Sequence, residues 1–207
     1  MVRLPKSFAD RYPTELSGGQ KQRVNLARAL AAKPDLVLCD EVTSALDAVV
    51  GAAIIDLLKE LRRELGIAYM FISHDLSTVA SFVDEIAVLY AGRLVEAGDT
   101  RSVLAHPRHP YSNLLVSSVP ELHIGWLEDT AAMRAMKAAL GGVVTSTAVG
   151  CAFADRCPFR IERVCEREAP PARRTDTGLV IYCHRTLEDL RTGVPTCSAN
   201  SGTRNAT

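Results

Sequence analysis

Apolar residues in the first third of the chain follow two different spacings, which predict strands and a helix. Leu36–Cys39 is a continuous apolar run between acidic residues, as expected of a strand buried on both faces. Apolar side chains recur at helical spacing from Ile54 to Leu65, and Gly66 is suited to end that helix. Ile67–Ile72 is a second apolar run. A strand, a helix and a strand in this order predict a parallel α/β sheet.

Shorter patterns predict further elements on either side of this unit. Ser17 is suited to cap a helix that ends before Pro34, and Ala91-Gly92 is suited to the turn of a hairpin. After residue 99, prolines divide the chain into short pieces, and the end of the chain is small and polar. The predicted ranges are helices over 17–31, 75–82 and 128–140, hairpin strands over 86–90 and 93–97, and a flexible tail over 191–207.

Composition and charge exclude several classes of protein. Hydrophobic residues make up 47% of the 207 residues, which is ordinary for a globular chain and excludes a wholly disordered one. The 24 basic residues balance the 24 acidic ones, so a broad basic surface for nucleic acid is not expected. No apolar run is long enough to span a bilayer, and no secretory leader follows Met1. Any role at a membrane is therefore expected to come through a partner.

A glycine turn before the first helix is the first candidate for chemistry. In Leu16-Ser17-Gly18-Gly19-Gln20, two glycines let the backbone approach a bound group, and the free N–H groups of a helix start favour an anion such as phosphate. Read alone, these residues are equally compatible with an ordinary capped helix start.

Acidic residues and a histidine follow the two predicted strands. Asp40 and Glu41 end the first strand, at the place where α/β nucleotide-binding folds hold Mg²⁺. The stretch Ser44-Ala45-Leu46-Asp47 comes next, and His74 follows the second strand. Each residue has a structural alternative: Asp40 as a strand-end cap, His74 as a loop histidine and Asp47 as a helix N-cap.

In this order, the motifs resemble the ATP-binding-cassette family of ATPases. Leu16–Gln20 is similar to the signature motif, Leu36–Glu41 to the Walker B strand, Ser44–Asp47 to the D-loop and His74 to the switch histidine. The resemblance implies the C-terminal part of an α/β P-loop NTPase domain, over residues 1–105. Val42 departs from the proline that the family usually has there, which affects loop stiffness more than chemistry.

The resemblance also implies a role for each residue. Asp40 would hold Mg²⁺, Glu41 would act as general base or orient the attacking water, and His74 would bond the γ-phosphate of ATP. Ser17, Gly18, Gly19 and Gln20 would contact ATP bound to the opposite subunit of a head-to-tail dimer. Asp47 would lie at the dimer interface.

One motif of the family is not found in the sequence. No Gly-x-x-x-x-Gly-Lys-Ser/Thr loop, which cradles the phosphates, occurs in the 207 residues. We therefore expect the chain to be the C-terminal part of a longer protein and to be inactive on its own. It could still present Ser17–Gln20 to a complete partner.

The second half of the chain resembles a particular subfamily. His106-Pro107-Arg108-His109-Pro110-Tyr111 is similar to a stretch of oligopeptide and dipeptide importer ATPases, a subfamily that includes some nickel importers. The cysteine-containing segment is similar to its C-terminal domain, which we place over residues 106–190. That resemblance implies a [4Fe–4S] cluster, with zinc as the rival metal. The implied ligands are Cys151, Cys157, Cys165 and Cys183. Four unligated cysteines are the remaining alternative, whereas Cys39 is expected to be a small core residue and Cys197 to have no role.

Together these features predict an ATP-binding and hydrolysing subunit of a bacterial ABC importer for peptides. Its expected partners are a second ABC ATPase subunit, identical or different, membrane permease subunits and, indirectly, a substrate-binding protein, with no nucleic acid. It would sit peripherally on the cytoplasmic face of the plasma membrane. The alternatives are a non-enzymatic remnant or partner half-site, and a soluble ABC ATPase acting on DNA or ribosomes.

Overall fold

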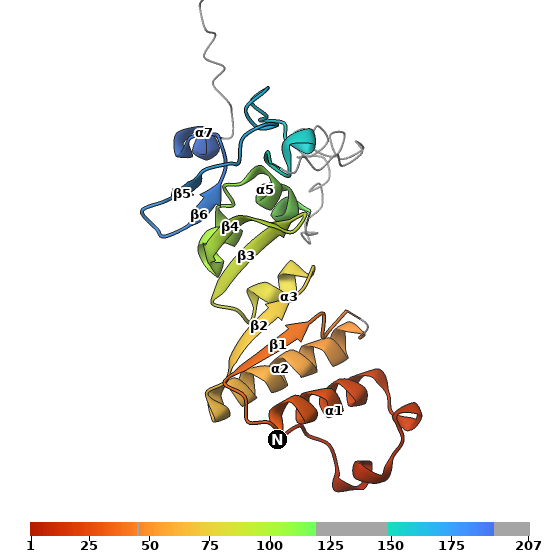
Figure 1. Ribbon diagram of the computed structural model, residues 1–207. Helices are drawn as coiled ribbons and strands as arrows, with labels where there is room; N and C mark the ends of the chain where they lie inside the picture. The colour runs from red at the N-terminus through yellow and green to blue at the C-terminus, as the bar shows by residue number, and fades with distance from the viewer. Residues whose placement is uncertain (45, 119–148, 193–207) are drawn as a thin grey trace, which may run out of the picture. The chain divides into compact units, whose positions relative to one another are not determined.

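The computed structural model describes residues 1–44, 46–118 and 149–192, and the chain divides into two compact units at Val83/Asp84. Figure 1 shows the order of the elements along the chain. Two short 3-10 helices, Lys6–Asp10 and Pro13–Glu15, open the first unit. The boundary predicted at residue 105 is based on where the sequence motifs end. The division at Val83 instead reflects how the residues pack into two compact units.

A small parallel sheet covered by one long helix forms the first unit. Strands β1 (Leu36–Asp40) and β2 (Ala68–Ile72) pair in parallel, and α2 (Ala48–Leu65) connects them. The apolar stripe of α2 is buried against the sheet, and Gly66 ends the helix in the left-handed conformation at φ +67°. The predicted strand–helix–strand order is therefore confirmed. The buried core is formed by Leu30, Val37, Cys39, Ile54, Ile55, Leu57, Leu58, Leu61, Ile67 and Phe82.

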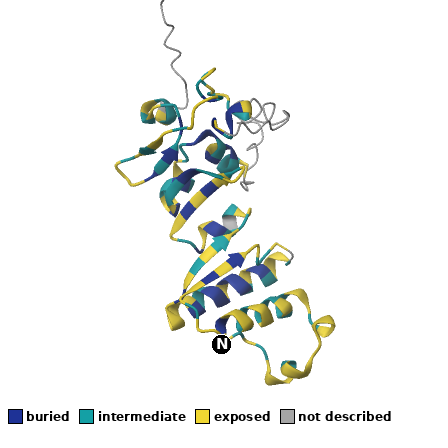
Figure 2. Ribbon diagram, in the orientation of Figure 1, coloured by how far each residue is buried: buried dark blue, intermediate teal, exposed yellow. Residues whose placement is uncertain are grey.

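The prediction that the Leu36–Cys39 strand is buried on both faces is wrong within the described residues. Val37 and Cys39 face α2 and are buried, but Leu38 on the opposite face is 64% exposed and Met70 beside it is 53% exposed. Figure 2 shows this alternation of buried and exposed positions along β1. The physical reason is that, among the described residues, α2 and Phe82 cover one face of the two-stranded sheet, whereas Leu38 and Met70 on the other face stay exposed.

The first helix begins where the sequence predicts. Helix α1 (Gly18–Leu30) is capped by Ser17, whose hydroxyl accepts from the Gln20 N–H, while the Gln20 side chain accepts from the Ser17 N–H at 2.9 Å. This reciprocal capping box satisfies two helix-end donors. The predicted short helix after His74 is α3 (Leu76–Ala80).

An antiparallel sheet forms the centre of the second unit. Strands β3 (Glu85–Tyr90) and β4 (Arg93–Asp99) form the predicted hairpin, with Ala91 and Gly92 both at positive φ in its turn. Two later strands, β5 (Ala172–Arg174) and β6 (Val180–Tyr182), extend the sheet in the order β3-β4-β6-β5. The hairpin therefore packs with the cysteine-containing segment.

Short helices complete the second unit. They are α4 (Thr100–Ala105), α5 (Pro110–Ser117), the 3-10 turn η3 (Ala154–Arg156) and α7 (Leu187–Thr192). The predicted helix over 128–140 lies outside the described residues, as does the predicted tail after residue 192, including Cys197.

Candidate functional site

The carboxyl ends of β1 and β2 bring the predicted catalytic residues together. Asp40 is the last residue of β1 and pairs with Ile72, the last residue of β2. Glu41 and His74 lie just beyond these ends, and the Nδ1 atom of His74 lies 3.2 Å from Oε1 of Glu41. Both side chains are more than half exposed, so the pair is open to a ligand or solvent. Neighbouring parallel strands end at the same edge of a sheet, which explains why residues 33 apart meet here.

The backbone of Glu41 has an unusual conformation. Glu41 has φ +45°, a left-handed conformation that costs a non-glycine residue free energy. Three hydrogen bonds hold it in place. The Glu41 N–H donates to the Ile72 carbonyl at 2.9 Å, and the Glu41 carbonyl accepts from the Ser44 N–H at 3.1 Å and the Ser44 hydroxyl at 2.9 Å.

The glycine turn at the start of α1 lies against the segment that follows Glu41. A Cβ added at Gly18 would lie 3.2 Å from Leu46, and one added at Gly19 would lie 2.5 Å from Val50. Any side chain at position 19 would therefore require the Val50 side chain or the packing of α1 on α2 to shift. The two glycines thus permit close helix packing, and the same packing places the Ser17 turn beside the predicted D-loop.

Asp47 caps the long helix of the first unit. Its carboxylate accepts from the Val50 N–H at 2.9 Å, which is the structural alternative that the sequence leaves open for this residue. The cap does not exclude a further contact, because Asp47 is exposed.

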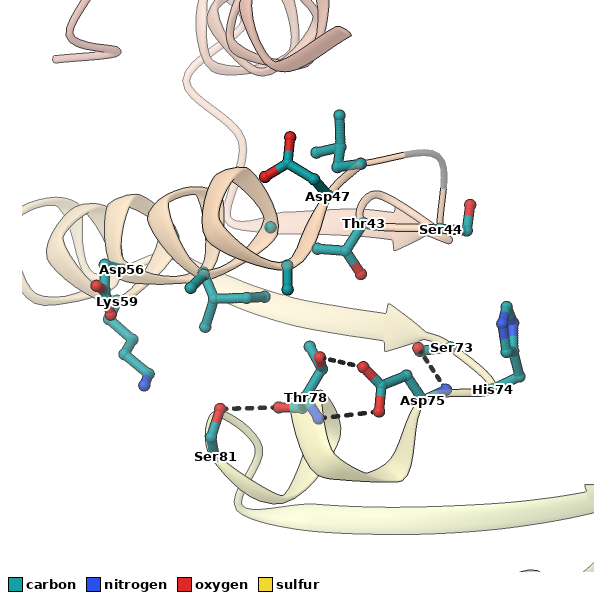
Figure 3. A pocket seen from close by; sticks show the side chains of 15 residues that line it. Thr43, Ser44, Asp47, Asp56, Lys59, Ser73, His74, Asp75, Thr78 and Ser81 are labelled. Carbon is teal, nitrogen blue, oxygen red and sulfur yellow. Dashed lines mark hydrogen bonds between the residues drawn. The ribbon is translucent and has the colours of Figure 1, made fainter. Parts of the chain in front are cut away.

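An open cavity of about 590 Å³ adjoins the site between α2 and α3. Figure 3 shows Ser44, Asp47 and His74 on its wall, with Asp75 bonded to Thr78 at the start of α3. The cavity is lined by both polar and apolar side chains, all of them from the first unit.

Four cysteines gather in the second unit. Cys151 and Cys165 are buried in one apolar cluster, against which Cys157 packs. The Cys151 N–H donates to the Cys165 carbonyl at 2.7 Å, and the Ile161 N–H donates to the Cys165 sulfur at 3.3 Å. Cys183 is buried just after β6, and none of the four forms a disulfide.

Burial raises the pKa of two of these thiols, and the neighbouring sulfurs add to the rise. Burial raises the pKa of Cys157 to about 12, with a further rise from the nearby Cys183, Cys151 and Cys165 sulfurs. Burial likewise raises the pKa of Cys183 to about 11, and the Cys151 and Cys165 sulfurs add to the rise. The four sulfurs therefore lie close enough to influence one another electrostatically.

Proximity alone does not make a metal site. Across residues 1–44, 46–118 and 149–192, no three His, Cys, Asp or Glu side chains form a group that could hold a metal ion. The described residues therefore do not form a [4Fe–4S] or zinc site on the four cysteines, and that site stays a prediction. Cys39, by contrast, is the expected core residue, 3% exposed in β1, and burial raises its pKa to about 11.

Sequence reasoning missed one polar residue that organises the second unit. Glu96 in β4 is fully buried, and its two carboxylate oxygens accept from the N–H groups of Arg108 and His109 at 2.9 and 3.0 Å. A single glutamate in the middle of a strand gives no signal of a partner twelve residues away in sequence. In the part of the chain that the structure describes, no helix is long and apolar enough to cross a bilayer.

Two protein families match the chain. Residues 1–44 match the family described as ABC transporter, and residues 95–165 match the oligopeptide/dipeptide transporter C-terminal region. The first match contains the Ser17 turn and the Asp40-Glu41 pair, and the second contains the His106–Tyr111 stretch and three of the four cysteines.

Similar proteins carry names from peptide transport. An ATP-binding protein of Brucella abortus named for peptide import is 42% identical over 184 residues, which is 89% of this chain and 53% of that protein. The dipeptide transport ATP-binding protein DppF of Haemophilus influenzae is 40% identical over 185 residues, 88% of this chain and 54% of its own length. The chain thus spans about half the length of the curated relatives it matches.

A solved structure agrees with these matches. An inward-facing transporter described as of the metal-chelate ABC type is 29% identical, with a TM-score of 0.50, over 57% of this chain and 45% of that one. The first unit, with its parallel strands and helices, is accordingly α/β and of the P-loop NTPase type. The chain is thus similar to ABC transporter ATP-binding proteins, and its second unit contains the match to the oligopeptide/dipeptide transporter C-terminal region.

Proposed function

We propose that this chain serves as an ATP-binding and hydrolysing subunit of a bacterial importer of peptides. The observation that carries the proposal is the 3.2 Å contact between Glu41 and His74 at the ends of two parallel strands, directly after Asp40. The names of the relatives, which refer to peptide, dipeptide and oligopeptide transport, support the substrate class.

Each residue of the site would have a separate task. Asp40 offers a carboxylate, the ligand type that Mg²⁺ prefers, and the bound ion would neutralise phosphate charge. Glu41 would accept a hydrogen bond from the attacking water and aim it at the γ-phosphate. His74 contacts Glu41 through Nδ1, which leaves Nε2 on the other side of the ring for the γ-phosphate.

The signature turn would complete a site on another subunit. Ser17 and Gln20 fix the start of α1, and its N–H groups favour a negatively charged ligand. We propose that Ser17, Gly18, Gly19 and Gln20 contact the γ-phosphate of ATP held by a second ABC subunit, with Asp47 at the interface. Permease subunits in the membrane would use the resulting opening and closing, which would place this chain on the cytoplasmic face of the plasma membrane.

By itself the chain is proposed to be inactive. Its 207 residues hold no phosphate-loop motif, so the N–H cradle and lysine that bind the phosphates would come from elsewhere. The same observation favours a second candidate, a non-enzymatic half-site that presents Ser17–Gln20 to a complete partner. The match to the oligopeptide/dipeptide region disfavours a soluble ABC ATPase acting on DNA or ribosomes.

A chimera tests the proposal. The segment of Haemophilus influenzae DppF that matches this chain is replaced by the chain, and phosphate release from Mg·ATP is measured together with growth on a dipeptide as sole source of a required amino acid. We expect both activities in the chimera, and Glu41→Gln to slow phosphate release about 10²–10⁴-fold. Glu64→Gln, at an exposed position of α2, is the matched control and should leave the rate unchanged.

Two results would contradict the proposal. Equal rates for the chimera and its Glu41→Gln variant would remove Glu41 from the mechanism. Turnover by the isolated chain at the rate of the chimera would refute its inactivity alone. A chimera that binds its partner but does not hydrolyse ATP would favour the half-site over the enzyme.

The cysteines support a separate proposal of a metal centre. We propose Cys151, Cys157, Cys165 and Cys183 as ligands of a [4Fe–4S] cluster, with zinc as the rival. The support is that Cys151 and Cys165 share one buried cluster, against which Cys157 packs, and that the Ile161 N–H already donates to the Cys165 sulfur, as amide groups do around cluster thiolates. The ligands would have to move into a common geometry on binding. Iron content and absorption near 400 nm after anaerobic purification test it; zinc would favour the rival and neither metal would overturn both.

A further inference from the structure

The buried carboxylate of Glu96 holds a turn of the chain onto the sheet. Glu96 lies in β4 between Val88 of β3 and Ile181 of β6 and has no exposed surface. Its Oε1 accepts from the Arg108 N–H at 2.9 Å and its Oε2 from the His109 N–H at 3.0 Å. A buried carboxyl group without such donors would be strongly destabilising, so the strand and the turn depend on each other.

The Arg108–His109 turn, held by Glu96 in this way, leads directly into helix α5. His109 is 1% exposed and caps the helix, because its Nδ1 accepts from the Tyr111 N–H at 3.1 Å. Pro110 follows at the first helical position, where its missing N–H costs nothing. The direction of α5, and with it the position of Tyr111, is therefore set by the two hydrogen bonds to Glu96.

An aromatic cluster connects this helix to the cysteine-containing segment. The ring of Phe153, 1% exposed, lies 5.5 Å from that of Tyr111, 5.2 Å from that of Tyr90 and 6.0 Å from that of His109, measured between centroids. The two tyrosine rings are themselves 4.7 Å apart. Three elements, β3, the His109 turn and α5, thus surround Phe153.

Phe153 in turn shares its buried cluster with two cysteines. Phe153 and Leu114 of α5 belong to the same buried cluster as Cys151 and Cys165. The hydrogen bond from the Cys151 N–H to the Cys165 carbonyl ties the two cysteines to each other. Cys183 is not a member of the cluster, and Arg173 donates to its carbonyl at 3.0 Å.

We propose that Glu96 is a positioning residue that controls chemical access to the thiols of Cys151 and Cys165. It does so by fixing the Arg108–His109 turn, through which α5 and Phe153 are held in the cluster that buries the two cysteines. Local release of this turn would admit a metal ion, an oxidant or an alkylating reagent to this pair, and would leave the rest of the second unit folded. The proposal does not depend on ATP binding or on the function proposed above.

Site-resolved thiol labelling tests the proposal. The full chain is reduced and treated with a chelator so that every thiol is free, and is then labelled with N-ethylmaleimide under native conditions; the labelled peptides are quantified by mass spectrometry. We expect Glu96→Gln to accelerate labelling of Cys151 and Cys165 about tenfold or more, equivalent to about 1.4 kcal/mol in the opening equilibrium. Glu85→Gln, exposed on the neighbouring strand β3, is the matched control and should change neither rate.

Two cysteines of the same chain serve as internal references. Cys183 reports loss of the second unit as a whole and Cys39 reports unfolding of the first unit, so neither should accelerate in Glu96→Gln. Phe153→Ala, which acts at the other end of the proposed connection, should accelerate the same two thiols. Unchanged labelling of Cys151 and Cys165 in Glu96→Gln, or an equal acceleration of Cys183, would overturn the proposal.

Discussion

The left-handed backbone at Glu41 makes a quantitative prediction about stability. At φ +45° a Cβ atom is crowded, which costs roughly 1–2 kcal/mol relative to an ordinary conformation. Glycine avoids that cost but loses more chain entropy on folding, a difference of about 0.4–1 kcal/mol. We therefore expect Glu41→Gly to be more stable than Glu41→Ala by about 0.5–1 kcal/mol. Because both variants lack the carboxylate, the loss of the His74 contact cancels between them.

An exposed helical position supplies the control. Ala52 lies in α2, where backbone angles are ordinary, so Ala52→Gly should destabilise the first unit by about 0.5–1 kcal/mol. Glycine is thus expected to give a more stable first unit than alanine at position 41 and a less stable one at position 52.

Labelling of Cys39 provides an assay specific to the first unit. Cys39 is 3% exposed in β1, so a brief pulse of alkylating reagent at each urea concentration reports how much of this unit is unfolded. The free energy of unfolding falls by about 1–3 kcal/mol per molar urea. A difference of about 1 kcal/mol in that free energy therefore moves the urea midpoint of unfolding by roughly 0.3–1 M. A midpoint for Glu41→Ala at or above that for Glu41→Gly would refute the argument from backbone strain.

Three further predictions follow from side chains described above. Asp47→Ala removes the cap of α2 and should lower the free energy of unfolding in the urea assay by about 1 kcal/mol. Asp47→Asn keeps a hydrogen-bond acceptor and should lower it by less. Leu61→Ala empties a fully buried position and should cost about 2–5 kcal/mol, against less than about 1 kcal/mol for the half-exposed Leu65→Ala. Burial lowers the pKa of His109 to about 4, so the second unit should lose stability as the pH falls from about 6.5 to about 4, because the unfolded chain takes up that proton first. His109→Asn should weaken that dependence in thermal melts between pH 4 and 7, whereas the exposed His106→Asn should not; an unchanged profile in His109→Asn would contradict the assignment.

The sequence allows the core of the first unit to be predicted because its determinants are local. The apolar stripe from Ile54 to Leu65 and the capping pair Ser17 and Gln20 need only neighbouring residues to act. The meeting of Glu41 and His74 is also predictable, because it follows from two parallel strands ending at one edge.

Other features depend on contacts that no local pattern contains. The exposed face of β1 and β2 is apolar in sequence, and whether it is covered depends on other layers rather than on the strands themselves. The role of Glu96 arises from a turn twelve residues later, and the positive φ of Glu41 from hydrogen bonds to Ile72 and Ser44. The sequence placed four cysteines in one segment, but their separations in space are set by tertiary packing.

The pairing of β4 with β6 determines when each part of the chain can become structured during synthesis. The strands of the first unit are complete once Ile72 has left the ribosome, whereas Glu96 and Ala97 must wait for Ile181 and Val180. Contacts between residues so distant in sequence form slowly, because a long loop has to close first. Until β6 has been synthesised, the nascent hairpin presents an unpaired strand edge on which another polypeptide can form intermolecular β-structure.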